Sequence, residues 1–365
     1  MTSVARQVPR ATRSAQRIRV LIVDDSLVIR HLIAEALGAD PEIEVVGAEA
    51  NGALALARIP ELRPDVVTLD IEMPVLDGLE TLKRIRKSHP KLRTIMFSTL
   101  TTRGAAVTFE ALAIGADDYV AKPANAGSLD KSLASLRSEL IPKIKQFFAM
   151  PAAPVRVMQA RKAPPPAPAK PASRAQPHLV AIGVSTGGPQ ALAQLIPKLP
   201  AGFSLPVVIV QHMPPMFTRL LAERLDADSG LKVQEAADGL EVRRGVVIVA
   251  RGDYHLRLRR SGALVTTVLD QGAPENSCRP SVDVLFRSVA EVYGEHVLAV
   301  MLTGMGSDGL LGMRALKSAG ASNLVQDQAS SVVWGMPGAI VEAGLADEVL
   351  PLDKIPDEMV RLAMG

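Results

Sequence analysis

A single serine lies between glycines in the segment GVSTG, residues 183–187, directly after the apolar run LVAIGV. This spacing fits G-x-S-x-G, a sharp strand-to-helix turn that exposes a serine hydroxyl as a nucleophile. The first turn of the following helix leaves backbone N–H groups free, and that of Thr186 could stabilise an oxyanion. Because serine-containing glycine turns are common in other roles, the pattern predicts catalysis only if a base lies near Ser185.

The histidines of the second half of the chain supply one candidate base. His212 directly follows the apolar run PVVIVQ, so it lies at the carboxyl end of a predicted strand, as Ser185 does. His296 precedes its predicted strand, His255 falls in a stretch that we predict to be irregular, and His178 ends a linker. Position therefore favours His212.

An acid that could orient His212 follows a third apolar run. Asp308 comes after VLAVMLTGMGS, which places it at the same edge of a parallel sheet. The chain order Ser, His, Asp differs from the order in α/β-hydrolases, but catalytic triads are defined by the roles of their residues and not by their order.

Two other functional classes compete with this hypothesis. GMGSDG is formally G-x-G-x-x-G, and with Gly304, Gly306 and Asp327 it would suit a dinucleotide-binding turn. That motif lies late in its domain, however, and leaves Ser185 and His212 unexplained. A transcription factor would need a DNA-reading element such as a helix-turn-helix, and we find no such segment.

The first half of the chain places carboxylates and a lysine at successive strand ends. Asp24 and Asp25 follow IRVLIV, Asp70 follows DVVTL, and Lys122 follows DYVA. Carboxylates that converge at one sheet edge repel each other and need a cation, and oxygen-only ligands suit Mg²⁺. One carboxylate could accept a phosphoryl group, whose charge Lys122 would neutralise and to which the hydroxyl of Ser98 could donate.

The elements that position these residues form two α/β domains. Before residue 150, five short apolar runs alternate with helix-period segments, which predicts a parallel sheet with helices on both faces. After residue 178 the alternation returns, interrupted by an irregular middle from LKVQEA to LVTTVL that contains an antiparallel hairpin around RSGA. We therefore expect a doubly wound, mostly parallel sheet. The predicted limits are a basic lead at 1–17, a first domain at 18–141, a helix end and Pro/Ala-rich linker at 142–177, and a second domain at 178–365.

Composition narrows the functional classes. The net charge is +3, but much of the excess lies in the lead and in residues 156–174, and aromatic residues are only 3% of the chain, so we expect no nucleic-acid binding. No apolar run approaches the roughly 18 residues of a membrane span, so we expect no membrane insertion. The single cysteine, Cys278, excludes an internal disulfide and suits a cytoplasmic location. Its local sequence ENSCRPS offers no histidine, so we expect Cys278 to be incidental and not a nucleophile.

Residues 18–140 resemble a response-regulator receiver domain, through VDDS, LDIEMPVLDGL, MFSTLT and DYVAKP. The resemblance implies a flavodoxin-like, five-stranded parallel sheet, and a chemotaxis histidine kinase as phosphodonor. It implies that Asp70 is the phosphoacceptor and that Mg²⁺ is bound by Asp24, Asp25 and Asp70. Lys122 would contact the phosphoryl group, and Ser98 and Tyr119 would be the switch residues.

Residues 178–362 resemble the catalytic domain of the chemotaxis protein-glutamate methylesterases. The motifs that carry the resemblance are AIGVSTGGP, QHMPPMFTRLLAERL, RPSVDVLFRSVA, LTGMGSDGLLGM and WGMPGAI. Carried over by position, they imply that Ser185 is the nucleophile, His212 the base and Asp308 the acid that orients it. The backbone N–H groups of Thr186 and Met305 would stabilise the oxyanion. No cofactor is implied for the ester chemistry.

The combined resemblance implies an enzyme that hydrolyses glutamate γ-methyl esters of chemoreceptors, releases methanol, and also deamidates receptor glutamines. Phosphorylation of the first domain would control hydrolysis by the second. The chain departs from the family pattern at Arg251, where the family usually has proline, and at Ser277 and Cys278, in a stretch that often holds histidine or arginine. These departures leave the predicted triad intact.

Overall fold

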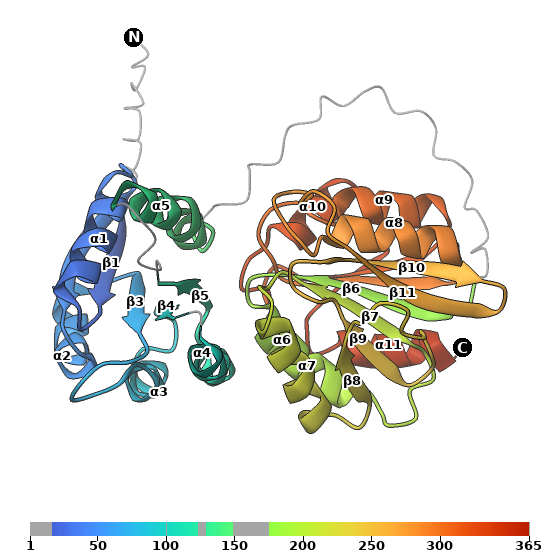
Figure 1. The fold of residues 1–365 in the computed structure, drawn as a ribbon, viewed down its shortest axis with the longest axis horizontal. Helices are drawn as coiled ribbons and strands as arrows, with labels where there is room; N and C mark the ends of the chain where they lie inside the picture. Colours follow the sequence, from blue (N-terminus) through green and yellow to red (C-terminus); the bar gives the residue numbers. More distant parts are fainter. Residues whose placement is uncertain (1–16, 100, 123–128, 149–174, 365) are drawn as a thin grey trace, which may run out of the picture. The chain divides into compact units, whose positions relative to one another are not determined.

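The computed structural model describes residues 17–99, 101–122, 129–148 and 175–364 (Figure 1). The predicted basic lead, apart from residue 17, and most of the predicted linker lie outside these residues, so the domain limits stay a prediction. By its internal contacts the chain divides into two compact units, Met1–Thr94 with Pro123–Lys145, and Ile95–Lys122 with Gln146–Gly365. Among the described residues, no helix has the length and apolar character needed to cross a membrane.

The N-terminal sheet has five strands in the order β2-β1-β3-β4-β5. The register of β1 with β2 and β3, and of β4 with β5, is parallel. The strands are β1 (Ile18–Val23), β2 (Ile43–Glu49), β3 (Val66–Asp70), β4 (Arg93–Ser98) and β5 (Asp118–Ala121). The predicted five-stranded parallel sheet is confirmed.

Helices alternate with these strands and cover both faces of the sheet. They are α1 (Leu27–Gly38), α2 (Gly52–Leu62), α3 (Gly78–Ser88), α4 (Thr102–Ile114) and α5 (Leu129–Lys145). Helix α1 packs with α5 on one face, and α2 packs with α3 on the other (Figure 1). Strand β3 is buried throughout, and β1 is buried except at Arg19. Both strands are mostly apolar because helices cover the sheet on both faces.

The C-terminal sheet has seven strands in the order β14-β13-β12-β6-β7-β9-β8, all paired in parallel. They are β6 (Leu179–Val184), β7 (Val207–Gln211), β8 (Lys232–Glu235), β9 (Val246–Val249), β12 (Val297–Met301), β13 (Ser322–Gln326) and β14 (Glu348–Leu350). The predicted antiparallel hairpin is confirmed as a separate two-stranded sheet, β10 (His255–Ser261) with β11 (Leu264–Asp270). The stretch that begins at LKVQEA was predicted to interrupt the parallel pattern, and this is wrong, because β8 and β9 continue it.

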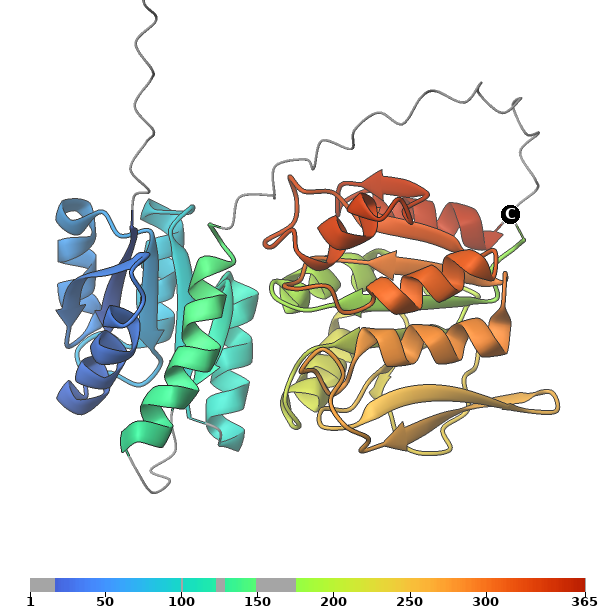
Figure 2. The same cartoon turned by 90° about the horizontal axis from the view of Figure 1, so that it is seen from above.

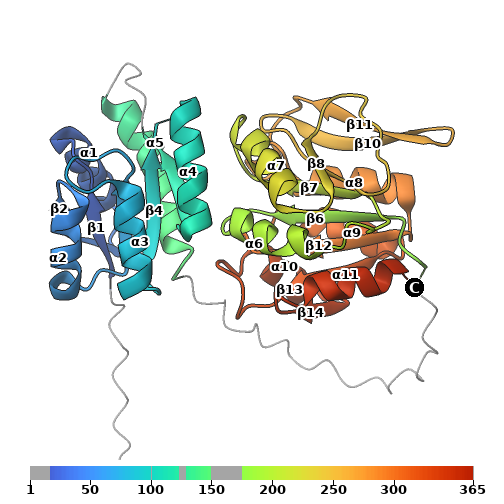
Figure 3. The ribbon, with the colours of Figure 1, turned by 90° about the horizontal axis from the view of Figure 1, so that it is seen from below.

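The helices of this domain again cover both faces of the sheet (Figures 2 and 3). They are α6 (Gly188–Leu195), the short 3₁₀ helix η1 (Ile196–Lys198), α7 (Phe217–Asp228), α8 (Val282–Tyr293), α9 (Leu310–Ser318), α10 (Met336–Glu342) and α11 (Ile355–Met364). Helix α8 packs against α9, β6 and the hairpin strand β10. Its residues Leu285, Phe286 and Val289 are fully buried in the main apolar core with Val208 and Ile248 of the sheet.

Both sheets change winding direction next to one strand. In the N-terminal sheet β1 lies between β2 and β3, and in the C-terminal sheet β6 lies between β7 and β12. The connections after the adjacent strands β1 and β3 run in opposite directions, as do those after β6 and β12, which opens a crevice at the carboxyl edge of each sheet. Ser185 follows β6, and Asp24 follows β1, so the sequence-predicted residues emerge at these two switch points.

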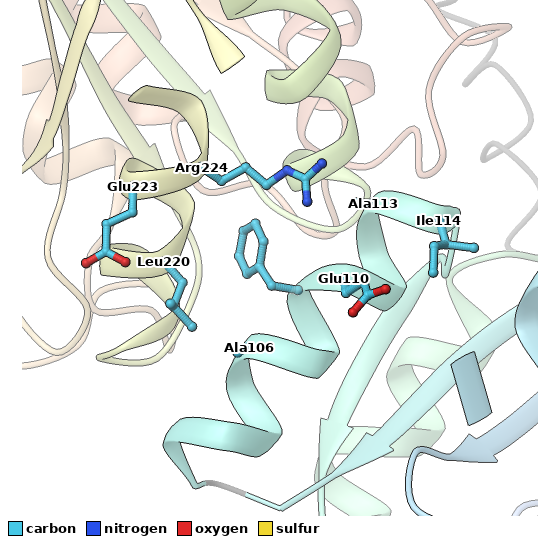
Figure 4. Close-up of a pocket in the computed structure, with 8 residues that line it drawn as sticks. Ala106, Glu110, Ala113, Ile114, Leu220, Glu223 and Arg224 are labelled. Carbon is cyan, nitrogen blue, oxygen red and sulfur yellow. The ribbon is translucent and has the colours of Figure 1, made fainter. Parts of the chain in front are cut away.

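The second compact unit contains a pocket of about 710 Å³ that is lined by residues of α4 and α7 (Figure 4). Its lining residues are Ala106, Phe109, Glu110, Ala113, Ile114, Leu220, Glu223 and Arg224. None of them is a residue that the sequence predicts for catalysis or phosphorylation.

Candidate functional site

Ser185 lies in a tight turn between β6 and α6. Its N–H donates to the carbonyl oxygen of Thr303 at 3.0 Å, and its carbonyl accepts from the N–H of Gly188 at 2.8 Å. Gly187 has a φ of 76°, where a Cβ is disfavoured, and a Cβ on Gly188 would come within 1.9 Å of Oε1 of Gln211. The two glycines therefore permit the turn that leaves Ser185 half-buried at the carboxyl edge of the sheet.

His212 leaves the sheet beside Ser185. Val184 and Gln211 are register partners in the β6–β7 pair, so the residues that follow them are neighbours at the same edge. The N–H of His212 donates to the carbonyl oxygen of Val184 at 3.2 Å, and Nε2 of Gln211 donates to the carbonyl oxygen of Ser185 at 2.9 Å. These bonds fix the turn that carries the histidine against the turn that carries the serine.

Asp308 comes from the loop after β12, the other neighbour of β6. Only 2% of its side chain is exposed, and its Oδ2 lies 2.8 Å from Nε2 of His212. The start of α8 supplies further donors: the N–H of Val282 at 2.6 Å from Oδ2 and the hydroxyl of Ser281 at 2.8 Å from Oδ1. A helix N-terminus favours an anion, so α8 keeps Asp308 charged and oriented toward His212.

Asp308 and His212 shift each other's pKa. Burial alone would lower the pKa of His212, but its hydrogen bonds to Asp308 and Cys278 raise that pKa to about 9. Burial alone would raise the pKa of Asp308, but His212 and the donors at the start of α8 hold it well below its usual range. At neutral pH the pair is therefore an imidazolium next to a carboxylate, and Asp308 remains ionised when His212 loses its proton.

Two backbone donors near Ser185 remain available. Within the described residues, neither the N–H of Thr186 nor that of Met305 donates to a protein acceptor. Thr186 begins the turn into α6, and Met305 lies in the glycine-rich loop that closely approaches Ser185. A Cβ on Gly304 would lie 2.9 Å from Cβ of Ser185, so this approach requires glycine.

The glycines of GMGSDG have structural roles that need no nucleotide. Gly304 lets the loop approach Ser185, while Gly306 and Gly309 have φ values of 81° and 92°. A Cβ on Gly309 would also come within 2.4 Å of Cε of Met301. Asp327, the candidate ribose acid, accepts hydrogen bonds from the N–H and the hydroxyl of Ser330, at 2.9 and 2.6 Å. It therefore closes a local turn.

The turn that precedes α8 contributes residues that the sequence analysis missed. Cys278 was expected to be incidental, and its local sequence gave no sign that its Sγ lies 3.6 Å from Nδ1 of His212. Nδ2 of Asn276 donates to Oδ1 of Asp308 at 2.9 Å and to Oδ2 of Asp283 at 3.0 Å. These residues are close to His212 only through the long-range packing of α8, and no local motif signals that proximity.

His255 was expected in an irregular stretch, which is also wrong, because it begins β10 and is almost fully buried. Its Nδ1 accepts the N–H of Ser281 at 3.3 Å, and its Nε2 donates to the carbonyl oxygen of Ala273 at 3.0 Å. Both of its ring nitrogens are hydrogen-bonded to the backbone, so His255 supports the chain next to Asp308.

The N-terminal domain brings its three acidic candidates together. Asp24 and Asp25 follow β1, Asp70 ends β3, and one carboxylate oxygen of each lies within 4.8 Å of the others. A Cβ on Gly78 would lie 2.2 Å from the carbonyl oxygen of Asp70, so glycine is required where α3 begins behind this residue. This all-oxygen donor set has the chemistry that Mg²⁺ prefers.

The remaining receiver candidates lie on the neighbouring strands. Ser98 ends β4 and its hydroxyl lies within hydrogen-bond distance of the carbonyl oxygens of Gly104 and Thr99, at 3.1 and 3.2 Å. Lys122 directly follows β5, and its N–H donates to the carbonyl oxygen of Ser98 at 2.7 Å. Tyr119 lies on β5 itself. Ser98 and Lys122 thus end adjacent parallel strands, at the edge where Asp70 ends β3.

Comparison with known proteins identifies the family. A model of the CheB methylesterase matches residues 180–359, and a model of the response regulator receiver domain matches residues 20–134. Over 352 residues the chain is 50% identical to the protein-glutamate methylesterase/protein-glutamine glutaminase of Trichodesmium erythraeum, covering 94% of this chain and 99% of that protein. This chain belongs to the protein-glutamate methylesterase/protein-glutamine glutaminase family.

Other members of the methylesterase/glutaminase family agree with this assignment. The Thermotoga maritima protein of the same name is 44% identical over 345 residues, covering 94% of this chain and 98% of that protein. The crystal structure of the Thermotoga maritima CheB methylesterase catalytic domain is 46% identical with a TM-score of 0.50, covering 52% of this chain and 100% of that chain. The resemblance drawn from the sequence motifs is confirmed, and the dinucleotide-binding and DNA-binding alternatives are set aside.

Proposed function

We propose that this protein hydrolyses the γ-methyl esters of glutamate side chains on chemoreceptors, in the cytoplasm, under the control of a chemotaxis histidine kinase. The observation that carries the proposal is the hydrogen bond of 2.8 Å between Nε2 of His212 and the buried carboxylate of Asp308, beside the turn of Ser185. This bond leaves Nδ1 as the ring nitrogen that can take a proton from the serine.

The first half of the reaction forms an acyl-enzyme. The hydroxyl oxygen of Ser185 attacks the ester carbonyl while Nδ1 of His212 accepts the hydroxyl proton. The free N–H groups of Thr186 and Met305 would stabilise the negative charge that develops on the carbonyl oxygen. When the tetrahedral species collapses, His212 gives the proton to the methoxy oxygen and methanol leaves.

The second half regenerates the enzyme. Water attacks the acyl-enzyme as His212 takes one of its protons, the bond to Ser185 breaks, and the glutamate carboxylate is released. A glutamine substrate would follow the same course with ammonia as the leaving group, so the site also suits deamidation. These steps use side chains and backbone groups of the chain itself.

The pH dependence of hydrolysis follows from the base. His212 must be neutral to accept the serine proton, and because its pKa is raised to about 9, protonation persists to a higher pH than for an ordinary histidine. We expect kcat/KM for methanol release to rise with pH and to inflect above 8. The rate should be measured from pH 6 to 10, with Ser185→Ala subtracted as background for spontaneous ester hydrolysis. An inflection at or below 6.5 would contradict the assignment of His212.

For the N-terminal domain, we infer that Asp70 is the phosphoacceptor. Asp24, Asp25 and Asp70 would hold Mg²⁺, which when bound would offset the negative charge of the incoming phosphoryl group. Lys122 would contact the phosphoryl oxygens, and Ser98 and Tyr119 would relay the phosphorylated state along β4 and β5.

Replacing Asp70 by asparagine tests this control. We expect a small-molecule phosphodonor with Mg²⁺ to stimulate methanol release from methylated receptor by wild type, and to have no effect on Asp70→Asn, because the amide cannot accept the phosphoryl group. Asp77→Asn is the matched control, since Asp77 accepts a hydrogen bond from the N–H of Glu80 at 2.8 Å as the N-cap of α3. Equal stimulation of wild type and Asp70→Asn would exclude Asp70.

A further inference from the structure

Cys278 lies at the one ring nitrogen of His212 that Asp308 does not occupy. Its Sγ is 3.6 Å from Nδ1, which is a hydrogen-bond distance for sulfur. Sγ of Cys278, a ring nitrogen of His212 and a carboxylate oxygen of Asp308 all lie within 4.8 Å of one another. The thiol is half-buried, so small molecules can reach it, and it is the single cysteine of the sequence.

The turn that carries Cys278 is fixed on three sides. The N–H of Cys278 donates to the carbonyl oxygen of Glu275 at 2.9 Å, and the N–H of Glu275 donates to the carbonyl oxygen of Cys278 at 3.1 Å. Glu275 accepts two hydrogen bonds, at 2.7 and 2.6 Å, from the guanidinium of Arg287 on α8. Asn276 is bound to Asp308. The sulfur is therefore held against the imidazole by a built turn.

The neighbours of this thiol are the imidazole of His212 and, beyond it, the carboxylate of Asp308. A positively charged imidazole next to a cysteine stabilises the thiolate, and the thiolate is the reactive form. Asp308 favours that positive charge through its hydrogen bond to the opposite nitrogen of the ring. The arrangement of sulfur, imidazole and carboxylate thus has the polarity of a cysteine–histidine–aspartate set, although Ser185 is the residue that the family motif assigns as nucleophile.

We propose that Cys278 is a reactive thiol, paired with His212, whose oxidation or alkylation switches off ester hydrolysis. Nδ1 of His212 is the nitrogen that must receive the proton of Ser185. A group added to the sulfur at 3.6 Å would occupy the space at that nitrogen or accept a hydrogen bond from it. The effect on hydrolysis rests on the proposed role of His212 as base, whereas the reactivity of the thiol does not.

The oxidative form of the switch needs a hydroperoxide. The thiolate of Cys278 attacks one oxygen of hydrogen peroxide, so that an S–O bond forms and the O–O bond breaks. The leaving hydroxide takes the proton of the His212 imidazolium and becomes water. The sulfur is oxidised by two electrons to a sulfenic acid and the peroxide is reduced, and a small thiol such as dithiothreitol reverses the change.

Labelling kinetics of the full chain test the pair directly. The disulfide reagent 5,5′-dithiobis(2-nitrobenzoate) reacts with thiolate and releases a coloured thiolate, and Cys278 is its only target in this sequence. We expect wild type to react at least about tenfold faster than His212→Gln at neutral pH, because the variant lacks the imidazole beside the sulfur. Equal rates in the two proteins would overturn the pairing.

Methanol release tests the switch. Wild type alkylated with iodoacetamide, or treated with hydrogen peroxide, should lose at least about 90% of its release, and dithiothreitol should restore it after peroxide only. Cys278→Ser and Cys278→Ala, each compared with its own untreated sample, should not respond to either reagent. Full release from stoichiometrically alkylated wild type would overturn the proposal. If His212→Gln hydrolyses ester normally, the catalytic assignment fails instead, and the labelling result still decides whether the pair exists.

Discussion

Methanol release from a methylated chemoreceptor should fall by about a thousandfold or more when Ser185 is replaced by alanine. Alanine removes the oxygen that attacks the ester. The residual rate would come from His212 acting on water and from the free N–H groups of Thr186 and Met305. The measurement is methanol released per enzyme at saturating receptor, with and without phosphodonor.

The fold should tolerate this substitution. Every hydrogen bond recorded for Ser185 in the described residues uses its backbone: its N–H donates to Thr303, and its carbonyl accepts from Gly188 and from the side chain of Gln211. We therefore expect the free energy of unfolding of Ser185→Ala to stay within about 0.5 kcal/mol of wild type. A loss of activity can then be attributed to chemistry and not to unfolding.

Ser307→Ala is the matched control for the serine experiment. Ser307 lies in the glycine-rich loop at the same edge of the sheet, but it is exposed. Its substitution removes a hydroxyl near the site without touching the turn after β6, so release should be close to that of wild type. Undiminished release from Ser185→Ala would mean that Ser185 only forms a turn, and the triad would have to be abandoned.

Regular features of the sequence were enough to place the main site residues. Parallel strands end at a common edge, so Ser185 after β6 and His212 after β7 could be expected to be neighbours from the apolar runs alone. Asp24, Asp70 and Lys122 follow from the same rule in the N-terminal domain. In each case the residue stands within two positions of a strand end, where the local pattern fixes its place in space.

The residues that surround Asp308 could not be found in this way. Asn276, Cys278 and Ser281 belong to a turn whose position depends on α8 packing between the sheet and β10, which no local pattern encodes. His255 was misplaced for a similar reason, because the polar and charged residues of HLRLRRS obscure a strand that is buried only at its start. The residues of the site that follow strand ends can thus be predicted from the sequence. Those in turns that are positioned by long-range packing cannot.

The two sites share one design principle with different chemistry. Each lies at a switch point, and each brings charged groups together at the carboxyl edge of its sheet. In the N-terminal domain three carboxylates share one edge, whereas Asp308 faces a cation, His212, and a helix N-terminus. The first arrangement suits an external cation, whereas in the second the histidine of the chain itself faces the carboxylate.

Replacing Asp308 by asparagine should lower kcat by about 10²- to 10⁴-fold while the protein stays folded. The amide would donate an N–H to Nε2 of His212, so the ring would carry its proton on Nδ1 instead. Nδ1 could then no longer accept the proton of Ser185. Loss of the carboxylate also removes the interaction that raises the pKa of His212, so the inflection of the pH–rate profile should move to lower pH.

Asp283→Asn provides the matched control, because Asp283 is an equally buried carboxylate in the first turn of α8, the helix whose N-terminus binds Asp308. It accepts hydrogen bonds from the N–H of Gly312 at 2.6 Å and from Asn276 at 3.0 Å, and in the described part of the chain no hydrogen bond joins it to His212. Burial raises the pKa of Asp283, so a neutral amide there costs less than at Asp308. We expect Asp283→Asn to lower the melting temperature but to leave the pH inflection unchanged. If both variants lose activity equally with unshifted inflections, Asp308 supports the fold of α8 and does not set the tautomer of His212.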